Sequence, residues 1–514
     1  MSNSRVQSPR RISTGLTGLD EVLCGGLPAG RTYLVRGPSG SGKTTLALQY
    51  ALEGARRGER VLFVMLTETR EEIMEVIDSH GWSLGGLHLH EVIERPETLM
   101  REAESTLFTS ADLELGATVK EIIDLTHGLR PTRVVLDPLS ELRAIAVDSL
   151  RFRRQFLALK QVFADVGATG LLVEEMEPGH KAGDQLENIA HGVLLLEQQT
   201  PTYGPERRRL RVVKVRGISY LGGHHDLDIR TGGIEVYPRP IDVAPPVPAP
   251  PRLVSTRSRT LDDLLGGGLE TGATTIVMGE PGTGKSSVIS HCVSALASQD
   301  FTCLMYLFEE RAHLFLQRAS SLGLPIKEQI EAGSISLHQV DPEQMSPGRL
   351  IQHIRDFVGA VHRGVVVLDS LGGLSRSLYE EPFLPFRLRE LLSWLSRRGV
   401  VTFASLQTPS SPERGDISYL ADTVILLRHL EREMKIEKSI SVLKRRGGAH
   451  DSSVRRLLLT PAGLEIGQPI SSAQPGEPPR GQPVKEHGEA SGKQEQTGSV
   501  TNEESPEKSN GQPA

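Results

Sequence analysis

Short runs of apolar residues alternate with helix-forming stretches along most of the chain. In the first half, the apolar runs cover residues 61–66, 134–136, 171–173, 193–196 and 210–215. Continuous apolar runs of this length are typical of buried strands, and their alternation with helices predicts a sheet that is mostly parallel and covered on both faces. The pattern therefore predicts an α/β fold.

The second half of the chain repeats this series. Its apolar runs cover residues 275–278, 303–308, 365–368, 400–405, 424–427 and 440–443. Between the halves, residues 241–251 are dominated by proline and cannot continue a helix or an inner strand. They predict a semi-rigid, extended linker.

These patterns predict five segments. From residue 468 to the end the chain has no aromatic residue and is rich in Pro, Gly, Ser, Gln and Glu. Such a composition cannot bury enough apolar surface to become ordered. The predicted organisation is a disordered arm at 1–10, a first domain at 11–240, a linker at 241–252, a second domain at 253–466 and a disordered C-terminal tail at 467–514.

A phosphate-binding loop follows the first strand of the first domain. Residues 37–44 read Gly-Pro-Ser-Gly-Ser-Gly-Lys-Thr, which is the complete G-x-x-x-x-G-K-[ST] motif, and a helix-forming stretch comes next. In this context, backbone N–H groups surround a phosphate and the helix N-terminus adds the positive end of its dipole. We expect Lys43 to reach the β- and γ-phosphates of ATP and the Thr44 hydroxyl to hold Mg²⁺.

The same motif recurs at residues 279–286, and the two copies stay in register upstream: Leu19-Asp20 matches Leu261-Asp262 without a gap. A glycine loop without a ligand would not repeat in this way, so the chain is predicted to contain a duplicated nucleotide-binding domain. The predicted nucleotide contacts are Gly37, Ser39, Gly40, Ser41, Gly42, Lys43, Thr44 and Thr45 in the first loop and Gly279, Gly282, Thr283, Gly284, Lys285, Ser286 and Ser287 in the second.

Acidic residues occur where such domains need them. Asp137 and Asp369 each end a buried apolar run, which is the Walker B position, and with Thr44 and Ser286 they are the predicted Mg²⁺ ligands. Glu309-Glu310 follows the strand at 304–308 and is predicted to orient the attacking water or hydroxyl. The first domain has Thr67-Glu68 there, so only Glu68 remains. A solvated acidic turn is the alternative interpretation.

Composition limits the classes of function. The formal charge of the 514-residue chain is −6, which gives no general reason to expect a nucleic-acid ligand. Three cysteines without metal-ligand spacing suggest a reducing compartment. The N-terminus lacks the apolar core of a signal peptide, and no apolar run approaches the ~20 residues needed to cross a bilayer. A cytoplasmic location without membrane contact is expected.

The combination of motifs resembles one family. Each half opens with S-T-x-x-x-x-L-D-[ED]-x-L-x-G-G-L, and the P-loops, Phe308-Glu309-Glu310, the Walker B aspartates and the strand at 422–427 follow. Over residues 11–466 the chain resembles the KaiC family of double-domain ATPases, first known from the cyanobacterial circadian clock. The resemblance implies two tandem RecA-like domains, a homohexameric double ring and ATP held between subunits. It implies slow hydrolysis in the first domain and, as in the clock members, autophosphorylation in the second.

The resemblance also assigns roles to basic residues. Lys214 and Arg216, like Lys444 and Arg446, match the K-x-R strands whose cations reach the γ-phosphate on the adjacent subunit. Without the resemblance, these residues read as an exposed basic strand edge. Lys43, Lys285, Glu68, Glu309 and Glu310 match the family's catalytic positions.

The chain departs from the family pattern at three places. Thr67 replaces the first glutamate, which is expected to slow the first domain. Ala190-His191-Gly192 stands where the second half has Ala421-Asp422-Thr423. The phosphorylation pair reads Ser418-Tyr419, so Ser418 is the predicted phosphoacceptor and the threonine is lost.

Three functions follow as hypotheses. The first is an ATPase and serine autokinase that acts in signalling through protein partners. The second is a RecA-type recombinase or helicase, which needs basic loops inside the ring; residues 176–188 and 408–418 carry a single Lys or Arg each, so nucleic acid is not expected. The third is a scaffold that nucleotide binding switches without phosphotransfer.

Overall fold

A computed structural model describes residues 10–92, 110–146, 148–176, 185–202, 204–242, 250–341, 345–377, 383–408, 418–432 and 435–470. Residues 1–9 of the predicted arm, most of the predicted linker, most of the segments 176–188 and 408–418, and the tail from residue 471 onward lie outside the described residues. The backbone of Ser418 is described, but its side chain is not.

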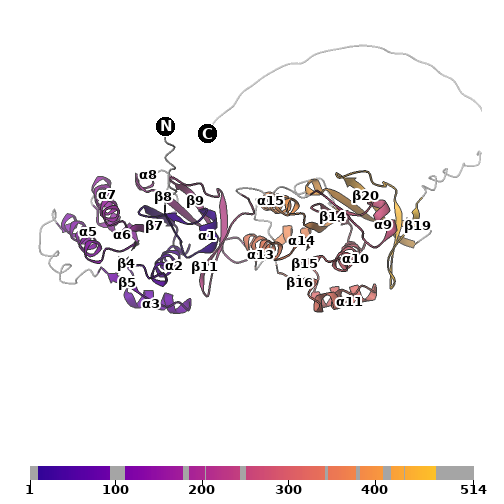
Figure 1. The fold of residues 1–514 in the computed structure, drawn as a ribbon, viewed down its shortest axis with the longest axis horizontal. Coiled ribbons are helices and arrows are strands. Elements are labelled where there is room, and N and C mark those ends of the chain that lie inside the picture. Colours follow the sequence, from indigo (N-terminus) through magenta and orange to yellow (C-terminus); the bar gives the residue numbers. More distant parts are fainter. Residues whose placement is uncertain are drawn as a thin grey trace, which may run out of the picture. The chain divides into compact units, whose positions relative to one another are not determined.

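Within the described residues, the first half of the chain forms a nine-stranded sheet with helices on both faces (Figure 1). The strand order is β11-β10-β9-β8-β3-β7-β6-β4-β5. The strands are β3 (Thr32–Gly37), β4 (Val61–Met65), β5 (Leu87–Glu91), β6 (Arg133–Asp137), β7 (Thr169–Glu175), β8 (Gly192–Gln199), β9 (Arg207–Val215), β10 (His224–Arg230) and β11 (Gly233–Tyr237). The helices are α1 (Thr17–Val22), α2 (Lys43–Arg56), α3 (Arg70–Ser79), α5 (Ser110–Leu129), α6 (Leu139–Ile145), α7 (Ser149–Asp165) and α8 (Gln185–Ile189).

The second half forms a sheet of the same kind within the described residues, in the order β16-β15-β17-β18-β14-β19-β20-β21-β22. Its strands are β14 (Thr274–Gly279), β15 (Thr302–Leu307), β16 (Ile335–Gln339), β17 (Gly364–Asp369), β18 (Val401–Gln407), β19 (Thr423–Arg432), β20 (Lys435–Arg445), β21 (Arg455–Thr460) and β22 (Gly463–Pro469). Its helices are α9 (Arg259–Leu264), α10 (Lys285–Ala297), α11 (Ala312–Ser321), α12 (Ile326–Glu331), α13 (Pro347–Ala360), α14 (Leu371–Ser377) and α15 (Leu384–Arg397), with the 3₁₀ turn η1 (Ser418–Leu420). The small strand pairs β1 (Arg11–Ile12) with β2 (Leu27–Pro28) and β12 (Leu253–Val254) with β13 (Leu269–Glu270) open the two halves.

The direction of the strands decides where side chains meet. In the first sheet, β8, β3, β7, β6, β4 and β5 run parallel, whereas β9, β10 and β11 continue the sheet in antiparallel pairs. The second sheet repeats this arrangement around β14. The carboxyl ends of the parallel strands share one edge, where ligands of open α/β sheets bind. The predicted α/β fold with two RecA-like domains is therefore confirmed.

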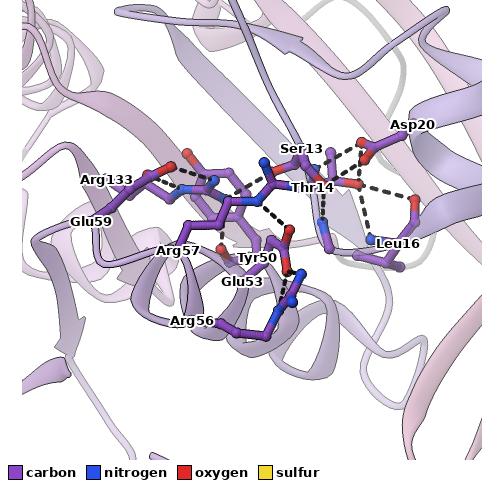
Figure 2. A network of polar contacts seen from close by, with 11 residues as sticks. Ser13, Thr14, Leu16, Asp20, Tyr50, Glu53, Arg56, Arg57, Glu59 and Arg133 are labelled. Atoms are coloured by element: carbon purple, nitrogen blue, oxygen red, sulfur yellow. Dashed lines mark hydrogen bonds and ion pairs between the residues drawn. The ribbon is translucent and has the colours of Figure 1, made fainter. Parts of the chain in front are cut away.

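The sequence signature that opens each half forms a local set of hydrogen bonds in the segment that precedes the central sheet. The Asp20 carboxylate accepts hydrogen bonds from the Thr14 N–H at 2.8 Å, the Thr14 hydroxyl at 2.7 Å and the Ser13 hydroxyl at 2.6 Å (Figure 2). Asp262 accepts the same set from Thr256 and Ser255. The signature is therefore a local cap: the aspartate satisfies backbone and hydroxyl donors that the turn leaves open.

A buried arginine anchors this segment in the first half. Arg133, at the start of β6, is fully buried and its Nε lies 2.6 Å from Glu59 (Figure 2). Its guanidinium donates to the carbonyl oxygens of Ser13 and Tyr50 and lies over the Tyr50 ring. One side chain thus ties the opening segment to α2 and β6, the two elements that carry the phosphate-binding loop and Asp137.

Candidate functional site

The two glycine-rich motifs form turns that expose a helix N-terminus. Gly42 and Gly284 precede α2 and α10 with φ values of +97° and +103°, a region that favours glycine. A Cβ atom at Gly42 would lie only 2.7 Å from Cδ1 of Ile229, so a larger residue there would also have to displace the end of the Ile229 side chain. No side chain of a described residue caps either helix, so their first N–H groups are available to a phosphate.

The loop lysines lie inside these turns. Nζ of Lys43 donates to the carbonyl of Pro38 at 2.8 Å, and Nζ of Lys285 donates to the carbonyls of Gly279 and Glu280 at 2.9 and 3.0 Å. Burial lowers the pKa of both ammonium groups, while nearby acidic residues oppose the shift. Each ammonium group is therefore held at the place where a phosphate would be bound. The remaining predicted contacts lie in the same loops and in the first turns of α2 and α10; among them, Thr44, Thr45, Ser286 and Ser287 are in these first turns.

The predicted Walker B carboxylate of the first half has the features of a cation ligand. Asp137 ends β6 and is 2% exposed, and its Oδ2 atom, like Oε2 of Glu68, has no hydrogen-bond partner among the described residues. Burial, together with the charge of Glu68, raises the pKa of Asp137 to about 7, and a hydrogen bond from Thr44 opposes that shift. Buried oxygens without a partner, beside a hydroxyl, are the donor set that Mg²⁺ prefers. The residues present therefore fit the predicted ion.

The second half holds its acidic residues in a denser set of contacts. Asp369 accepts a hydrogen bond from the Ser405 hydroxyl, and Glu309 accepts one from the Ser370 hydroxyl. Glu310 pairs with Arg318 of α11 at 2.7 Å. Burial raises the pKa of Glu310, against the opposing charge of Arg318. Both carboxylates of the predicted catalytic pair are thus oriented by side chains.

The K-x-R cations lie near the amino ends of the parallel strands, whereas the phosphate-binding loops follow the carboxyl ends. Lys214 pairs in register with Val193, and Lys444 with Val424, at the amino ends of β8 and β19. The loop lysine follows the carboxyl end of the neighbouring strand, roughly 13 Å away along that strand. Lys444 donates to the carbonyl of Ala421 at 2.7 Å, and Lys214 donates to that of Glu187. The cations are therefore separated from the phosphate-binding loop of their own half.

The hydrogen bonds of the arginines in these strands identify equivalent positions in the two halves. Arg216 donates to the carbonyl of Asn188 at 2.8 Å, and Arg446 donates to the carbonyl of Tyr419 at 3.0 Å. Asn188 and Tyr419 are thus equivalent, and Glu187 occupies in the first half the position that Ser418 has in the second. Glu187 was not predicted from the sequence, although the register between the two halves identifies its position.

The replacement of Asp422 by His191 preserves a contact. Oδ2 of Asp422 accepts the N–H of Thr274 at 2.9 Å, and Nδ1 of His191 accepts the N–H of Thr32 at 3.3 Å. Burial and nearby cations lower the pKa of His191 to about 4, so the neutral ring can accept this bond. Both residues thus satisfy the first N–H of the strand that leads to the phosphate-binding loop.

Comparison with known proteins identifies the family. A sequence profile of the KaiC ATPase family matches the chain twice, over residues 12–241 and 254–471. The chain belongs to the KaiC family. It is 24% identical to the circadian clock protein KaiC3 of Synechocystis sp. over 91% of this chain and 94% of the relative. It is 26% identical to the circadian clock oscillator protein KaiC of Synechococcus elongatus, over 90% of each chain, and of Parathermosynechococcus lividus, over 90% and 86%.

Membership in the KaiC family supports an ATPase and the predicted ATP ligand. The individual site residues, the Mg²⁺ ligands and the roles of Lys214, Arg216, Lys444 and Arg446 stay predictions, as does Ser418. Among the described residues, no helix of this KaiC-family chain is both long and apolar enough to span a membrane.

Proposed function

We propose that this KaiC-family ATPase works as a homohexameric double ring in which each ATP is bound by one subunit and completed by the next. The observation that carries the proposal is the separation, in both halves, of the K-x-R cations from their own phosphate-binding loop. A head-to-tail neighbour would bring one edge of its sheet against the opposite edge of the next, as in rings with heterologous interfaces. Lys214 and Lys444 would then meet a γ-phosphate in trans.

In the second domain we assign serine phosphorylation. The loop N–H groups and Lys285 would hold the β- and γ-phosphates, and Ser286 with Asp369 would hold Mg²⁺, which offsets the charge on the phosphates. The Ser418 hydroxyl oxygen of the adjacent subunit attacks the γ-phosphorus while the bond to the β–γ bridging oxygen breaks. ADP leaves, and Glu309 takes the hydroxyl proton. The Ser370 hydroxyl, which donates to Glu309, would orient that base.

In the first domain we assign slow hydrolysis and an assembly role for ATP. Lys43, Thr44 and Asp137 supply the phosphate and cation contacts, but Thr67 leaves Glu68 as the remaining carboxylate of the pair. The position equivalent to Ser418 is Glu187, which has no hydroxyl to phosphorylate. ATP bound between subunits would stabilise the ring by mass action.

Incubation with γ-labelled ATP and Mg²⁺ tests the proposal when free phosphate and protein-bound label are both measured. We expect label on Ser418, its loss in Ser418→Ala, and unchanged labelling in the control Ser396→Ala, an exposed serine of α15. Phosphate release without bound label would make the protein a ring ATPase and refute the autokinase assignment. Nucleotide binding with neither product would favour a nucleotide-switched scaffold through which protein partners act.

A further inference from the structure

A buried arginine lies directly before the first phosphate-binding loop. Arg36 is the penultimate residue of β3 and is 1% exposed. Its Nε atom lies 2.8 Å from the Glu174 carboxylate on β7, the residue paired with it in the sheet. Its NH1 atom lies 2.7 Å from the Glu187 carboxylate on α8. The strand that leads into the loop is thus connected by charge to two other elements.

Arg143 completes this cluster. Its NH2 atom lies 2.5 Å from Glu174, and its helix, α6, begins two residues after Asp137. The four residues, which we call the Arg36 cluster, carry two positive and two negative charges. It therefore joins the strand of the phosphate-binding loop, the helix after the Walker B aspartate and α8.

The second half provides an internal comparison. At the positions equivalent to the Arg36 cluster it carries Met278, Leu406, Ser375 and Ser418, none of which is charged. The same sheet and loop form there without these four charges. Buried ion clusters are often no more stable than apolar residues of similar volume. The fold therefore does not require the charges, and a role specific to the first domain is indicated.

Glu187 connects the cluster to the opposite edge of the sheet. Its carboxylate is paired with Arg36, while its backbone carbonyl accepts the hydrogen bond from Nζ of Lys214. The next carbonyl along α8, that of Asn188, accepts from Arg216. The short helix α8 thus contacts both Arg36, which precedes the phosphate-binding loop, and the two cations Lys214 and Arg216.

We propose that Arg36 and Glu187 are positioning residues that couple adjacent nucleotide sites in the first ring. The inference rests on the proposed function, in which Lys214 and Arg216 complete the neighbour's site. When a neighbour's γ-phosphate draws these cations from their carbonyls, α8 is released on one side. Because the planar guanidinium of Arg36 has a fixed geometry, movement of Glu187 changes the position of β3 before Gly37. The second ring lacks this connection.

The test uses the full-length chain with Lys285→Ala, so that hydrolysis reports the first site. Arg36→Met with Glu174→Leu introduces the apolar pair of the second half, and Glu187→Gln removes one charge at a half-buried position. Met278→Leu is the matched control before the second loop. Ring size, unfolding temperature and the ATP dependence of hydrolysis are measured for each variant.

We expect a sigmoidal ATP dependence in the unsubstituted cluster and in the control. The Arg36→Met/Glu174→Leu variant should keep its ring and its unfolding temperature but show a hyperbolic curve, with kcat lowered by up to about 100-fold. Glu187→Gln should move in the same direction. A merely structural role would lower the unfolding temperature and leave the shape of the curve unchanged, which would overturn the proposal.

Lys214→Ala separates failure of this inference from failure of the proposed function. If Lys214→Ala abolishes hydrolysis in an intact ring while both cluster variants keep the sigmoidal curve, the shared site stands and the coupling is refuted. If Lys214→Ala hydrolyses normally, the shared site itself is refuted. Should the double variant not fold, Glu187→Gln decides: an unchanged sigmoidal curve overturns the coupling.

Discussion

The carboxylate of Asp226 on β10 accepts a 2.8 Å hydrogen bond from the backbone N–H of Gly348, in the first turn of α13. Asp226 also pairs with Arg387 of α15 and with Arg209 of β9. A Cβ atom at Gly348 would lie 2.6 Å from Cβ of Asp226, so only glycine permits this approach. A buried carboxylate of the first half is thus held by the second.

We expect Asp226→Ala to lower the unfolding free energy by about 3–5 kcal/mol, because it leaves the two arginines without their buried partner. Gly348→Ala should also destabilise the protein, since the added methyl group would collide with Asp226 and push α13 away from β10. Calorimetry or denaturant unfolding measures both. Asp165→Ala, at an exposed position, is the control and should change stability by less than about 0.5 kcal/mol. Equal effects at 165 and 226 would contradict the assignment.

The stability that Asp226 provides should depend on pH. Burial alone would raise the pKa of Asp226, but Arg387, Arg209 and the Gly348 N–H hold it below the usual value. A carboxyl group with a lowered folded-state pKa stabilises the protein fully above its unfolded pKa of about 3.9 and loses this effect as pH falls through the folded value. The difference in unfolding free energy between wild type and Asp226→Asn should be constant above about pH 5 and shrink below about pH 4.

ATP with Mg²⁺ should shift the protein toward the ring. If Lys214, Arg216, Lys444 and Arg446 contact a neighbour's nucleotide, each bound ATP stabilises the interface and assembly follows by mass action. Light scattering at micromolar protein, with and without ATP, measures the mass. A monomer under both conditions would rule out sites between subunits.

The two loop lysines should have separable effects. Lys43→Ala removes a phosphate contact from the first domain and should impair ring formation more than phosphotransfer. Lys285→Ala should leave the ring largely intact and abolish labelling of Ser418. Size analysis and γ-label incorporation on the same samples distinguish the two. The reverse result would mean that the roles of the domains are exchanged.

Mixing two inactive variants should restore phosphotransfer. Lys285→Ala lacks the loop lysine and Lys444→Ala lacks the trans cation, so each homogeneous ring should be inactive at the second site. In a random one-to-one ring, about a quarter of the interfaces combine an intact loop with an intact cation. Label incorporation should recover accordingly after the rings are dissociated and reassembled. If Lys444 served its own subunit, every chain would stay defective and nothing would be recovered.

Much of the candidate site was predictable because its residues lie close together in the sequence, within short motifs. The glycines that turn the loops, Lys43 and Lys285, and the aspartates that end apolar strands all lie in short segments whose backbone determines where they sit. The alternation of apolar runs and helices likewise predicted both sheets, since buried parallel strands need continuous apolar residues.

Contacts between distant segments were not predictable in this way. Arg36 interrupts an apolar strand, which marks it as unusual, but its partners Glu174 and Glu187 come from elements far along the chain and are identified only by the register of β3 with β7 and the placement of α8. The equivalence of His191 and Asp422 was also hidden, because a ring nitrogen and a carboxylate share an acceptor role without any likeness in sequence.

The position of the K-x-R cations on the far edge of each sheet has a consequence for genetics. In the proposed ring, a chain that carries Lys285→Ala together with Lys444→Ala would still enter the ring, but it would disable its own second site and also the second site of the subunit beside it. Because each such chain affects two sites, a minority of these chains would inactivate a larger fraction of the sites than their own fraction of the subunits. The variant would therefore behave as dominant when it is expressed with the unaltered protein. The loss of activity at different ratios of the two genes would therefore show whether each site is shared between two subunits.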